Sequence, residues 1–218
     1  MRVLNFLLDL LFPPRCVFCR GFLKKGEASP CERCIAELPF CAGRDVYSSG
    51  EAYTFCVSPL FYEDHVRLSH HRFKFQGFSW YDRAYGPLLA DYVAIHCKDQ
   101  YDLITWVPIG KKRLRKRGYD QGRLLAESTA EALGTRAHPT LQKVKNAAAM
   151  SGLGGREERR ANISDAYGAT DPALIAGKRV LLIDDVITTG STLEESAQCL
   201  LRAGAKEVLC ATLARAAV

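Results

Sequence analysis

Long apolar runs, internal repeats and low-complexity segments are all missing from this 218-residue sequence. Residues 1–12 come nearest to a membrane span, but the run is too short to cross a bilayer and Asp9 interrupts it. A Pro-Pro-Arg sequence at residues 13–15 stands where a signal peptide would have a small-residue cleavage site. We therefore expect a cytoplasmic protein. Residues 1–12 instead predict a short amphipathic helix that docks on the protein's own core or on a partner.

Without an export signal, the nine cysteines are expected to stay reduced, because disulfides are rare in the cytosol. Four of them form two CxxC pairs that are eleven residues apart: Cys16, Cys19, Cys31 and Cys34. Each pair can present two thiolates to one ion from a tight turn, and four thiolates make a closed tetrahedral Zn²⁺ site. We predict a structural zinc in an N-terminal segment, residues 1–45, which is too small to rely on a core of its own.

Other metal ligands are open alternatives. Cys41 could be a spare or substitute ligand, and His70 and His71 could contribute as well. Adjacent histidines diverge on any regular element, so the cluster without them is favoured. The remaining cysteines are expected to be small buried side chains; these are Cys56, Cys97, Cys199 and Cys210.

The most informative segment runs from Val180 to Glu195, with the sequence VLLIDDVITTGSTLEE. Residues 180–183 form a continuous apolar run, which is typical of a central parallel strand covered on both faces. The strand is predicted to end at Asp184 and Asp185. Carboxylates at that position can accept hydrogen bonds from paired ribose hydroxyls or hold a divalent cation through water.

A short hydroxyl-rich loop follows the two acids: Thr188, Thr189, Gly190, Ser191 and Thr192. Gly190 allows a tight turn and a close approach to a ligand. A helix is expected to start near Thr192, and the free N–H donors of its first turn suit a phosphate. The loop lacks the GxxxxGK[ST] pattern of a nucleotide P-loop, so we predict a sugar-phosphate site. The plainer alternative is a strand that leads into a capped helix, with two surface acids.

A second signal follows a predicted strand at residues 103–107, which Pro108 ends. Six of the next residues are basic: Lys111, Lys112, Arg113, Arg115, Lys116 and Arg117. A loop of this charge at the carboxyl end of a strand is well placed for pyrophosphate or a nucleic acid backbone. The net charge of +6 also favours anionic ligands. A solvated basic run is the alternative.

The rest of the chain alternates strands with helices, which predicts one α/β domain over residues 46–218 with an open, mainly parallel sheet flanked by helices. Predicted helices cover residues 82–96, starting near Gly86-Pro87, then 121–133 and 191–203; predicted strands lie at 52–61 and 207–213. Residues 65–75 contain both basic and aromatic residues, which suits binding of single-stranded nucleic acid. The simpler alternative is a helix or strand that docks on the core through Phe73 and Phe75. The polar stretch 135–177 is expected to be a mobile hood or a linker.

Taken together, these motifs resemble the ComF family of competence proteins. The resemblance rests on six segments: LLFPPRCVFC, the two CxxC pairs, HRFKFQG, VPIGKKRLRKRGYDQ, SGLGGREERRAN and VLLIDDVITTGSTL. It implies a zinc-finger-like N-terminus on a type I phosphoribosyltransferase-like domain. In that family Asp184 and Asp185 would bind the ribose hydroxyls of phosphoribosyl pyrophosphate (PRPP), and residues 188–192 its 5-phosphate.

The resemblance also implies Mg²⁺ with PRPP and a role in natural transformation, acting on incoming single-stranded DNA at the cytosolic side. A helicase or a membrane DNA channel at the inner face of the membrane are candidate partners. Two positions depart from the family pattern: Asp120 in the RGYDQ turn, where it would lower the local positive charge, and Met150 before the SGL segment.

Three kinds of function stay open at this point. The protein could be a phosphoribosyltransferase that transfers to an unknown acceptor, a module that binds a sugar phosphate and DNA, or an adaptor that docks through its zinc segment. No residue is recognisable as a general base, so catalytic residues stay unassigned.

Overall fold

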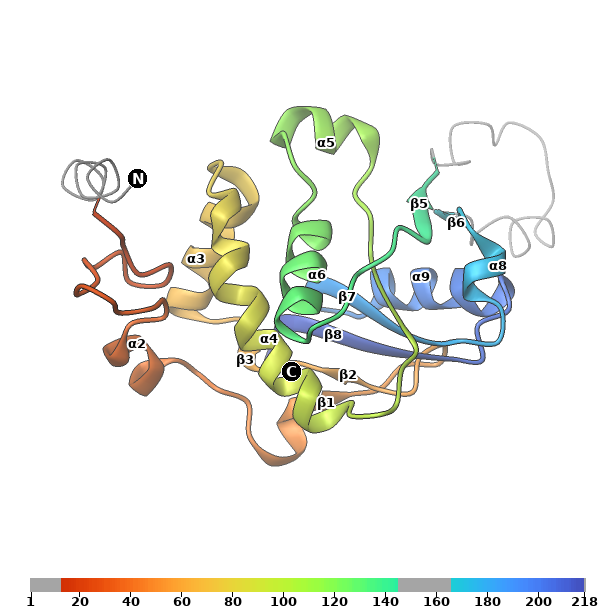
Figure 1. Ribbon diagram of the computed structural model, residues 1–218, viewed down its shortest axis with the longest axis horizontal. Helices are drawn as coiled ribbons and strands as arrows, with labels where there is room; N and C mark the ends of the chain where they lie inside the picture. Colours follow the sequence, from red (N-terminus) through yellow and green to blue (C-terminus); the bar gives the residue numbers. More distant parts are fainter. Residues whose placement is uncertain (1–12, 145–165, 218) are drawn as a thin grey trace.

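The computed structural model describes residues 13–144 and 166–217 (Figure 1). The predicted amphipathic helix at residues 1–12 and the SGL segment lie outside the described residues. The main sheet has six strands in the order β1-β2-β8-β7-β4, and β3 also pairs with β8. Every pairing is parallel except that of β1 with β2, which confirms the predicted sheet. The strands are β1 Tyr47–Ser48, β2 Cys56–Val57, β3 Leu60–Phe61, β4 Leu103–Trp106, β7 Arg179–Ile187 and β8 Glu207–Arg215.

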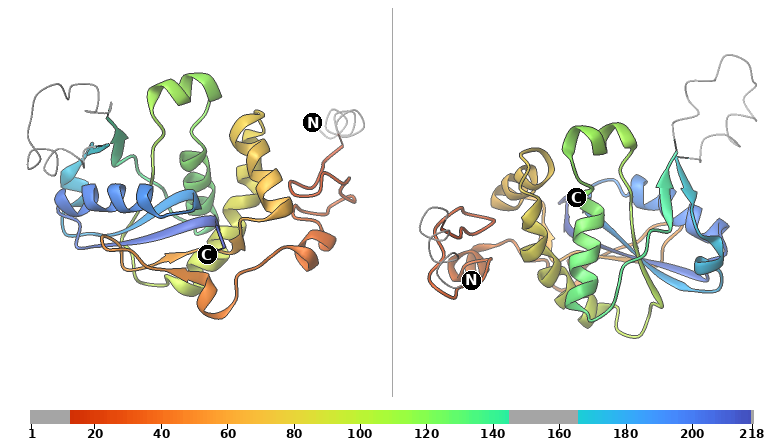
Figure 2. Two further views of the ribbon diagram at one scale, coloured as in Figure 1. Left: turned by 180° about the vertical axis from the view of Figure 1, so that it is seen from behind. Right: turned by 45° about the horizontal axis from the view of Figure 1, so that its top comes forward.

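Helices cover both faces of this sheet (Figures 1 and 2). On one face, α4 (Asp82–His96) and α6 (Gln121–Ala132) pack on alternate residues of β7, including Leu181. On the other face, α9 (Ser191–Arg202) and α8 (Pro172–Ile175) pack on the intervening residues, including Leu182. Two-sided burial explains why the core strands are continuous apolar runs rather than alternating ones.

The start of α4 differs from the prediction. A short 3₁₀ turn, η2 (Ser79–Tyr81), leads directly into a helix that begins at Asp82, so Pro87 lies inside it. Proline there removes one backbone hydrogen bond. Gly86 allows α4 and α6 to approach closely beside this proline, because a Cβ on it would lie 2.2 Å from Ser128 Oγ of α6.

The basic-aromatic segment forms helix α3 (Asp64–Phe75). Docking through Phe73 is confirmed, since its side chain is fully buried, but docking through Phe75 is wrong, since that ring is 63% exposed. Residues two apart on a helix point to different faces, so the two rings cannot enter one core.

The basic segment also differs from the prediction. We expected a loop, whereas residues Lys111–Arg117 form a seven-residue helix, α5, that projects from the body of the molecule (Figure 1). Lys, Arg and Leu favour helix, and Gly118 ends it in the left-handed conformation, with φ of 85°. A separate antiparallel pair, β5 (Leu141–Lys143) and β6 (Tyr167–Ala169), lies within the predicted hood, on either side of residues 145–165, which lie outside the described residues.

The N-terminal segment packs on the domain. It contains helix α2 (Glu32–Glu37) and the 3₁₀ turn η1 (Gly43–Val46). Val17 and Phe18 are buried in the same core as residues of α3, α4 and α6. Within residues 13–144 and 166–217, none of the helices has the length and apolar character needed to cross a membrane.

Candidate functional site

The two acids of the sugar-phosphate motif lie within β7 rather than at its end. We predicted that the strand stops at Asp184, but it continues to Ile187 because β8 runs alongside it as far as Arg215. As a result both carboxylates are enclosed: Asp184 is 8% exposed and Asp185 is 4% exposed.

Asp185 is held by two side chains of α3. Its Oδ2 lies 3.1 Å from Lys74 Nζ and 3.1 Å from His70 Nε2. The contact with His70 is within ion-pair distance, although its alignment is not that of a hydrogen bond. Tyr62 Oη lies 3.1 Å from His70 Nδ1. If the phenol donates to Nδ1, the imidazole carries its proton on Nε2, towards Asp185.

The surroundings of the two acids shift their pKa values in opposite directions. Burial alone would raise the pKa of Asp185, but His70 and Lys74 outweigh it and hold that pKa well below its usual range. Burial, and then the charge of Asp185, raise the pKa of Asp184 well above its usual range. Asp185 therefore ionises more readily than Asp184, and Asp184 Oδ1 accepts a hydrogen bond from the backbone N–H of Asp185 at 2.8 Å. Carboxyl oxygens at these two positions can accept hydrogen bonds from paired hydroxyls.

Sequence reasoning missed this role of α3. His70 and His71 were considered as metal ligands, but His70 is buried against Asp185 while His71 is exposed beside Phe75. The spacing of His70 and Lys74, four residues apart, places both on one face of a helix and was the available signal.

The hydroxyl-rich loop is where it was predicted. Gly190 has φ of 77° and precedes α9, which begins at Ser191, the first residue of the helix predicted over 191–203. Thr188, Thr189, Ser191 and Thr192 are exposed. Glu194, in the first turn of α9, connects this helix to residues 51 and 52. It accepts hydrogen bonds from the backbone N–H of Ala52 at 2.5 Å and of Glu51 at 3.2 Å. The first turn of α9 thus presents hydroxyls and free N–H donors to solvent.

Asp120 has a different role from the one expected. Its carboxylate accepts from the N–H of Ile109 at 3.0 Å and of Arg123 at 3.2 Å, so it caps α6 and fixes the segment between β4 and α5. Burial raises its pKa. Gly122 permits this arrangement, because a Cβ on it would lie 2.8 Å from the carbonyl oxygen of Val107.

The basic residues of α5 are on an exposed helix. Only Arg117 is partly buried: it donates to Gln121 and lies over the ring of Phe75, with 5.3 Å from its Cζ to the ring centroid. Between α5, α6 and β5 lies a cavity of about 390 Å³, lined by Trp106, Ile109, Lys111, Arg123 and Lys143 among others. Its walls come from residues 106–124 and 141–143, and sequence reasoning did not find it because the cavity depends on how α5, α6 and β5 pack together.

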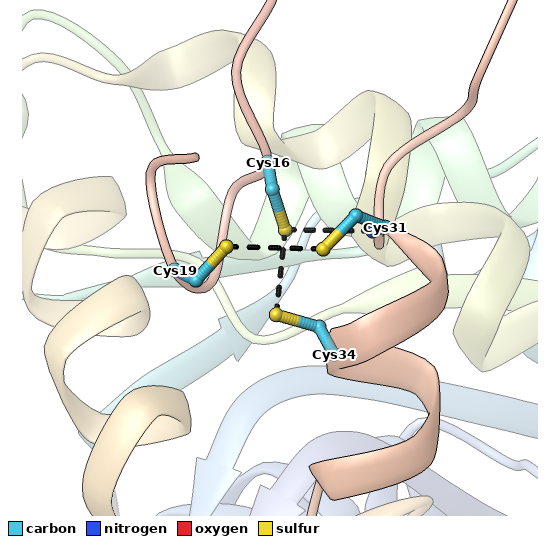
Figure 3. A group of neighbouring side chains, drawn as sticks. All are labelled: Cys16, Cys19, Cys31 and Cys34. Carbon is cyan, nitrogen blue, oxygen red and sulfur yellow. Dashed lines mark hydrogen bonds between the residues drawn. The ribbon is translucent and has the colours of Figure 1, made fainter. Parts of the chain in front are cut away.

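The four predicted cysteines converge (Figure 3), with all sulfurs within 4.8 Å of one another. Cys16 Sγ lies 3.6 Å from Cys34 Sγ, and Cys19 Sγ lies 3.8 Å from Cys31 Sγ. Sulfurs bound to a tetrahedral zinc at about 2.3 Å would be about 3.8 Å apart, so the geometry fits the ion. Cys41, His70 and His71 are not part of this cluster among the residues that the structure describes.

Backbone donors prepare the cluster for a cation. The N–H of Cys31 points to Cys16 Sγ at 3.5 Å, and the N–H of Gly21 to Cys19 Sγ at 3.4 Å. Burial opposes ionisation of Cys16, but backbone donors outweigh it and lower the pKa of this thiol to about 6. Burial raises the pKa of Cys34. A bound Zn²⁺ would supply the charge that stabilises all four as thiolates.

Two family models match this chain. The Phosphoribosyl transferase domain model matches residues 121–218, and the Double zinc ribbon domain model matches residues 7–46. Together with the parallel sheet and the cysteine cluster, they define a phosphoribosyltransferase-like α/β domain with an N-terminal zinc ribbon.

Three relatives narrow this class. Competence protein F of Haemophilus influenzae is 32% identical over 225 residues, which cover 93% of this chain and 97% of that protein. DNA utilization protein YhgH of Salmonella typhi is 32% identical over 84% of this chain and 78% of its own length. Competence protein ComFC of Bacillus subtilis is 28% identical over 87% of this chain and 78% of its own. The chain belongs to the ComF family of competence proteins.

Among solved structures, the glutamine PRPP amidotransferase of B. subtilis, complexed with ADP and GMP, is similar to this protein over 60% of this chain and 26% of the amidotransferase chain. The sequence identity is 24% and the TM-score is 0.44.

Proposed function

We propose that this protein binds PRPP or a related sugar phosphate at the carboxyl end of β7, and that it acts in the handling or import of single-stranded DNA during natural transformation. One observation carries the first part. The buried Asp184–Asp185 pair lies three residues before an exposed, hydroxyl-rich helix N-terminus at residues 188–192. The competence relatives support the second part.

Each portion of PRPP has a chemically matched partner in this proposal. The ribose hydroxyls meet Asp184 and Asp185, and the 5-phosphate meets the first turn of α9. Mg²⁺ would be held by the diphosphate and, through water, by the acids. The diphosphate lies towards the basic residues of α5, where guanidinium and ammonium groups offset its charge.

A calorimetric titration with PRPP and Mg²⁺ tests the pocket. We expect clear binding heat with the wild type and none with the double variant Asp184→Asn/Asp185→Asn. Asp91→Asn is the matched control, because Asp91 is an exposed acid on α4. Equal heats in the wild type and the double variant would exclude this pocket.

The surface near α5 supports the proposal that the protein binds single-stranded DNA. Six exposed or half-buried basic side chains can contact phosphates, and the exposed ring of Phe75 is available to stack on a nucleobase. Arg117 connects the two features through its contact with Phe75. Binding of this kind is independent of sequence and strongly dependent on salt.

Fluorescence anisotropy with a labelled oligonucleotide, measured over a range of salt concentrations, tests this part. Replacing Lys111 and Lys112 by Gln should weaken binding and reduce the salt slope by about 0.7 for each lost phosphate contact. Lys98→Gln, an exposed lysine beyond the end of α4, should leave the slope unchanged. A slope that is the same in all three proteins would exclude α5 as the DNA contact.

The cavity beside α5 favours a second candidate, an active phosphoribosyltransferase. At about 390 Å³ it can hold an acceptor of one or two rings near the diphosphate. An acceptor nucleophile would form a bond to the anomeric carbon of PRPP while the bond to pyrophosphate breaks. Release of pyrophosphate that depends on an added acceptor would establish this activity.

We place this function on the cytosolic side, at the inner face of the membrane, with a competence helicase or a membrane DNA channel as partner. The zinc ribbon is the element that such a partner would contact. Co-purification with and without residues 1–40 tests this assignment.

A further inference from the structure

The first zinc knuckle is held by one helix, and that helix also holds the ribose-binding acid of the proposed site. Figures 1 and 2 show α3 beside the N-terminal segment. The knuckle is the turn that contains Cys16 and Cys19, closed by hydrogen bonds from Arg20 N to Cys16 O and from Cys16 N to Gly21 O, both 2.9 Å. The carbonyl groups of Val17 and Phe18 lie inside this turn and are available to a neighbour.

Two side chains of α3 bind these carbonyls. Ser69 Oγ donates to Val17 O at 2.6 Å, and Arg72 Nη2 donates to Val17 O at 3.0 Å and to Phe18 O at 2.7 Å. Ser69 is fully buried, and its hydroxyl also lies 2.5 Å from Tyr85 Oη of α4. Buried carbonyls that accept a charged donor are costly to leave without it, so these contacts are strong constraints on the helix.

The adjacent face of α3 carries the second set of contacts. His70 follows Ser69 directly, and Lys74 is two residues after Arg72. Both reach Asp185 Oδ2 at 3.1 Å. Because α3 is a regular helix, a shift or rotation that breaks the contacts with the knuckle also displaces His70 and Lys74 from Asp185.

We propose that Ser69 and Arg72 are positioning residues, which couple zinc binding in the ribbon to the geometry of Asp185. The metal fixes the knuckle, the knuckle fixes α3, and α3 fixes the two groups that keep Asp185 ionised. The reverse also holds, because coupling between two ligands is reciprocal: a sugar phosphate at Asp185 strengthens zinc retention by the same factor. The ligand part of this proposal rests on the proposed function, whereas the structural part does not.

Hydrogen exchange measured by mass spectrometry, with and without a zinc chelator, tests the structural part without any ligand. We expect faster exchange in α3 and at residues 184–190 after chelation, with α6 unchanged. An increase confined to residues 13–41 would overturn the proposal. So would an increase of similar size in α6, because it would report a general loss of stability.

Arg72→Lys tests the ligand part. Lysine keeps the positive charge but cannot reproduce the forked contact with two carbonyls. We expect PRPP to bind roughly 5- to 150-fold more weakly, the usual range of coupling between sites, with zinc content unchanged. Arg67→Lys, an exposed arginine on the same helix, is the control. Equal affinity in the two variants would overturn the coupling. If the wild type itself does not bind PRPP, the proposed function fails, while the exchange experiment still decides this inference.

Discussion

Lys74 Nζ lies 3.1 Å from Asp185 Oδ2, in a position where the acid is almost fully enclosed. The lysine comes from α3 and the acid from β7, so the contact joins the first half of the chain to the strand that bears the sugar-phosphate motif. It also explains how one of two neighbouring buried acids can keep its charge.

Removal of this lysine should lower stability in a manner that depends on pH. The depressed pKa of Asp185 gives stability that is present above its unfolded pKa, about 3.9, and is lost as the pH falls through the folded value. Lys74→Met reduces this depression, so we expect a loss of about 1–3 kcal/mol in the free energy of unfolding at pH 7. Urea denaturation at several pH values should show the gap closing below about pH 4. A gap that does not change with pH would contradict this explanation.

Asp184→Asn should have the opposite effect. The raised pKa of Asp184 means that its contribution to stability is present below the unfolded pKa and declines as the pH rises towards the folded value. Asparagine has the same shape without this penalty. We expect a higher melting temperature at pH 7, by roughly 2–4 °C for each kcal/mol gained, with the gain increasing from pH 4 upwards. Scanning calorimetry at matched pH values provides the measurement, and an unchanged melting temperature at pH 7 would show that Asp184 carries no such penalty.

Zinc should bind as a single ion held by the four clustered cysteines. Cys34→Ser is expected to abolish metal retention and to lower the melting temperature, because the ribbon shares its core with α3, α4 and α6. Cys41→Ala is the matched control: Cys41 is buried nearby but lies outside the cluster. Metal analysis of the purified variants decides between them, and zinc loss in the control would place Cys41 among the ligands.

Asp120→Ala should show how much the two hydrogen bonds of this carboxylate contribute to stability. The variant loses the cap of α6 and the hydrogen bond to Ile109, which should cost about 0.5–2 kcal/mol of stability. Asp120→Asn can accept from only one of the two N–H groups, because the wild type uses a different carboxylate oxygen for each, so we expect an intermediate loss. Thermal denaturation of the two variants gives the comparison. A loss in Asp120→Asn equal to that in Asp120→Ala would mean that the one retained acceptor contributes nothing at this position.

The sequence predicted the parts of the site that are local in the chain. Three local patterns predicted their structures directly: the apolar run before Asp184 predicted a buried strand, Gly190 a tight turn, and the CxxC spacing a zinc site. Each pattern could be recognised because it involves residues close together in the chain. The parallel sheet also followed from the alternation of strands and helices. These predictions agree with the structure.

The rest depends on contacts between distant segments. The extension of β7 beyond the acids is imposed by β8, and the enclosure of Asp185 is imposed by α3; neither partner is adjacent in the sequence. The helical state of Lys111–Arg117 was missed for a different reason, since a basic run after a strand was interpreted by its charge and not by its helix propensity.

The contact between Gly122 and the carbonyl of Val107 limits how this sequence can diverge. No side chain fits at position 122 without moving α6 away from β4, and that movement would break the link between Asp120 and Ile109. Homologues that keep the site are therefore expected to retain glycine there. The exposed positions of α5 are free of this steric limit, so the constraint on them comes from the charge that the proposed ligands require and not from packing.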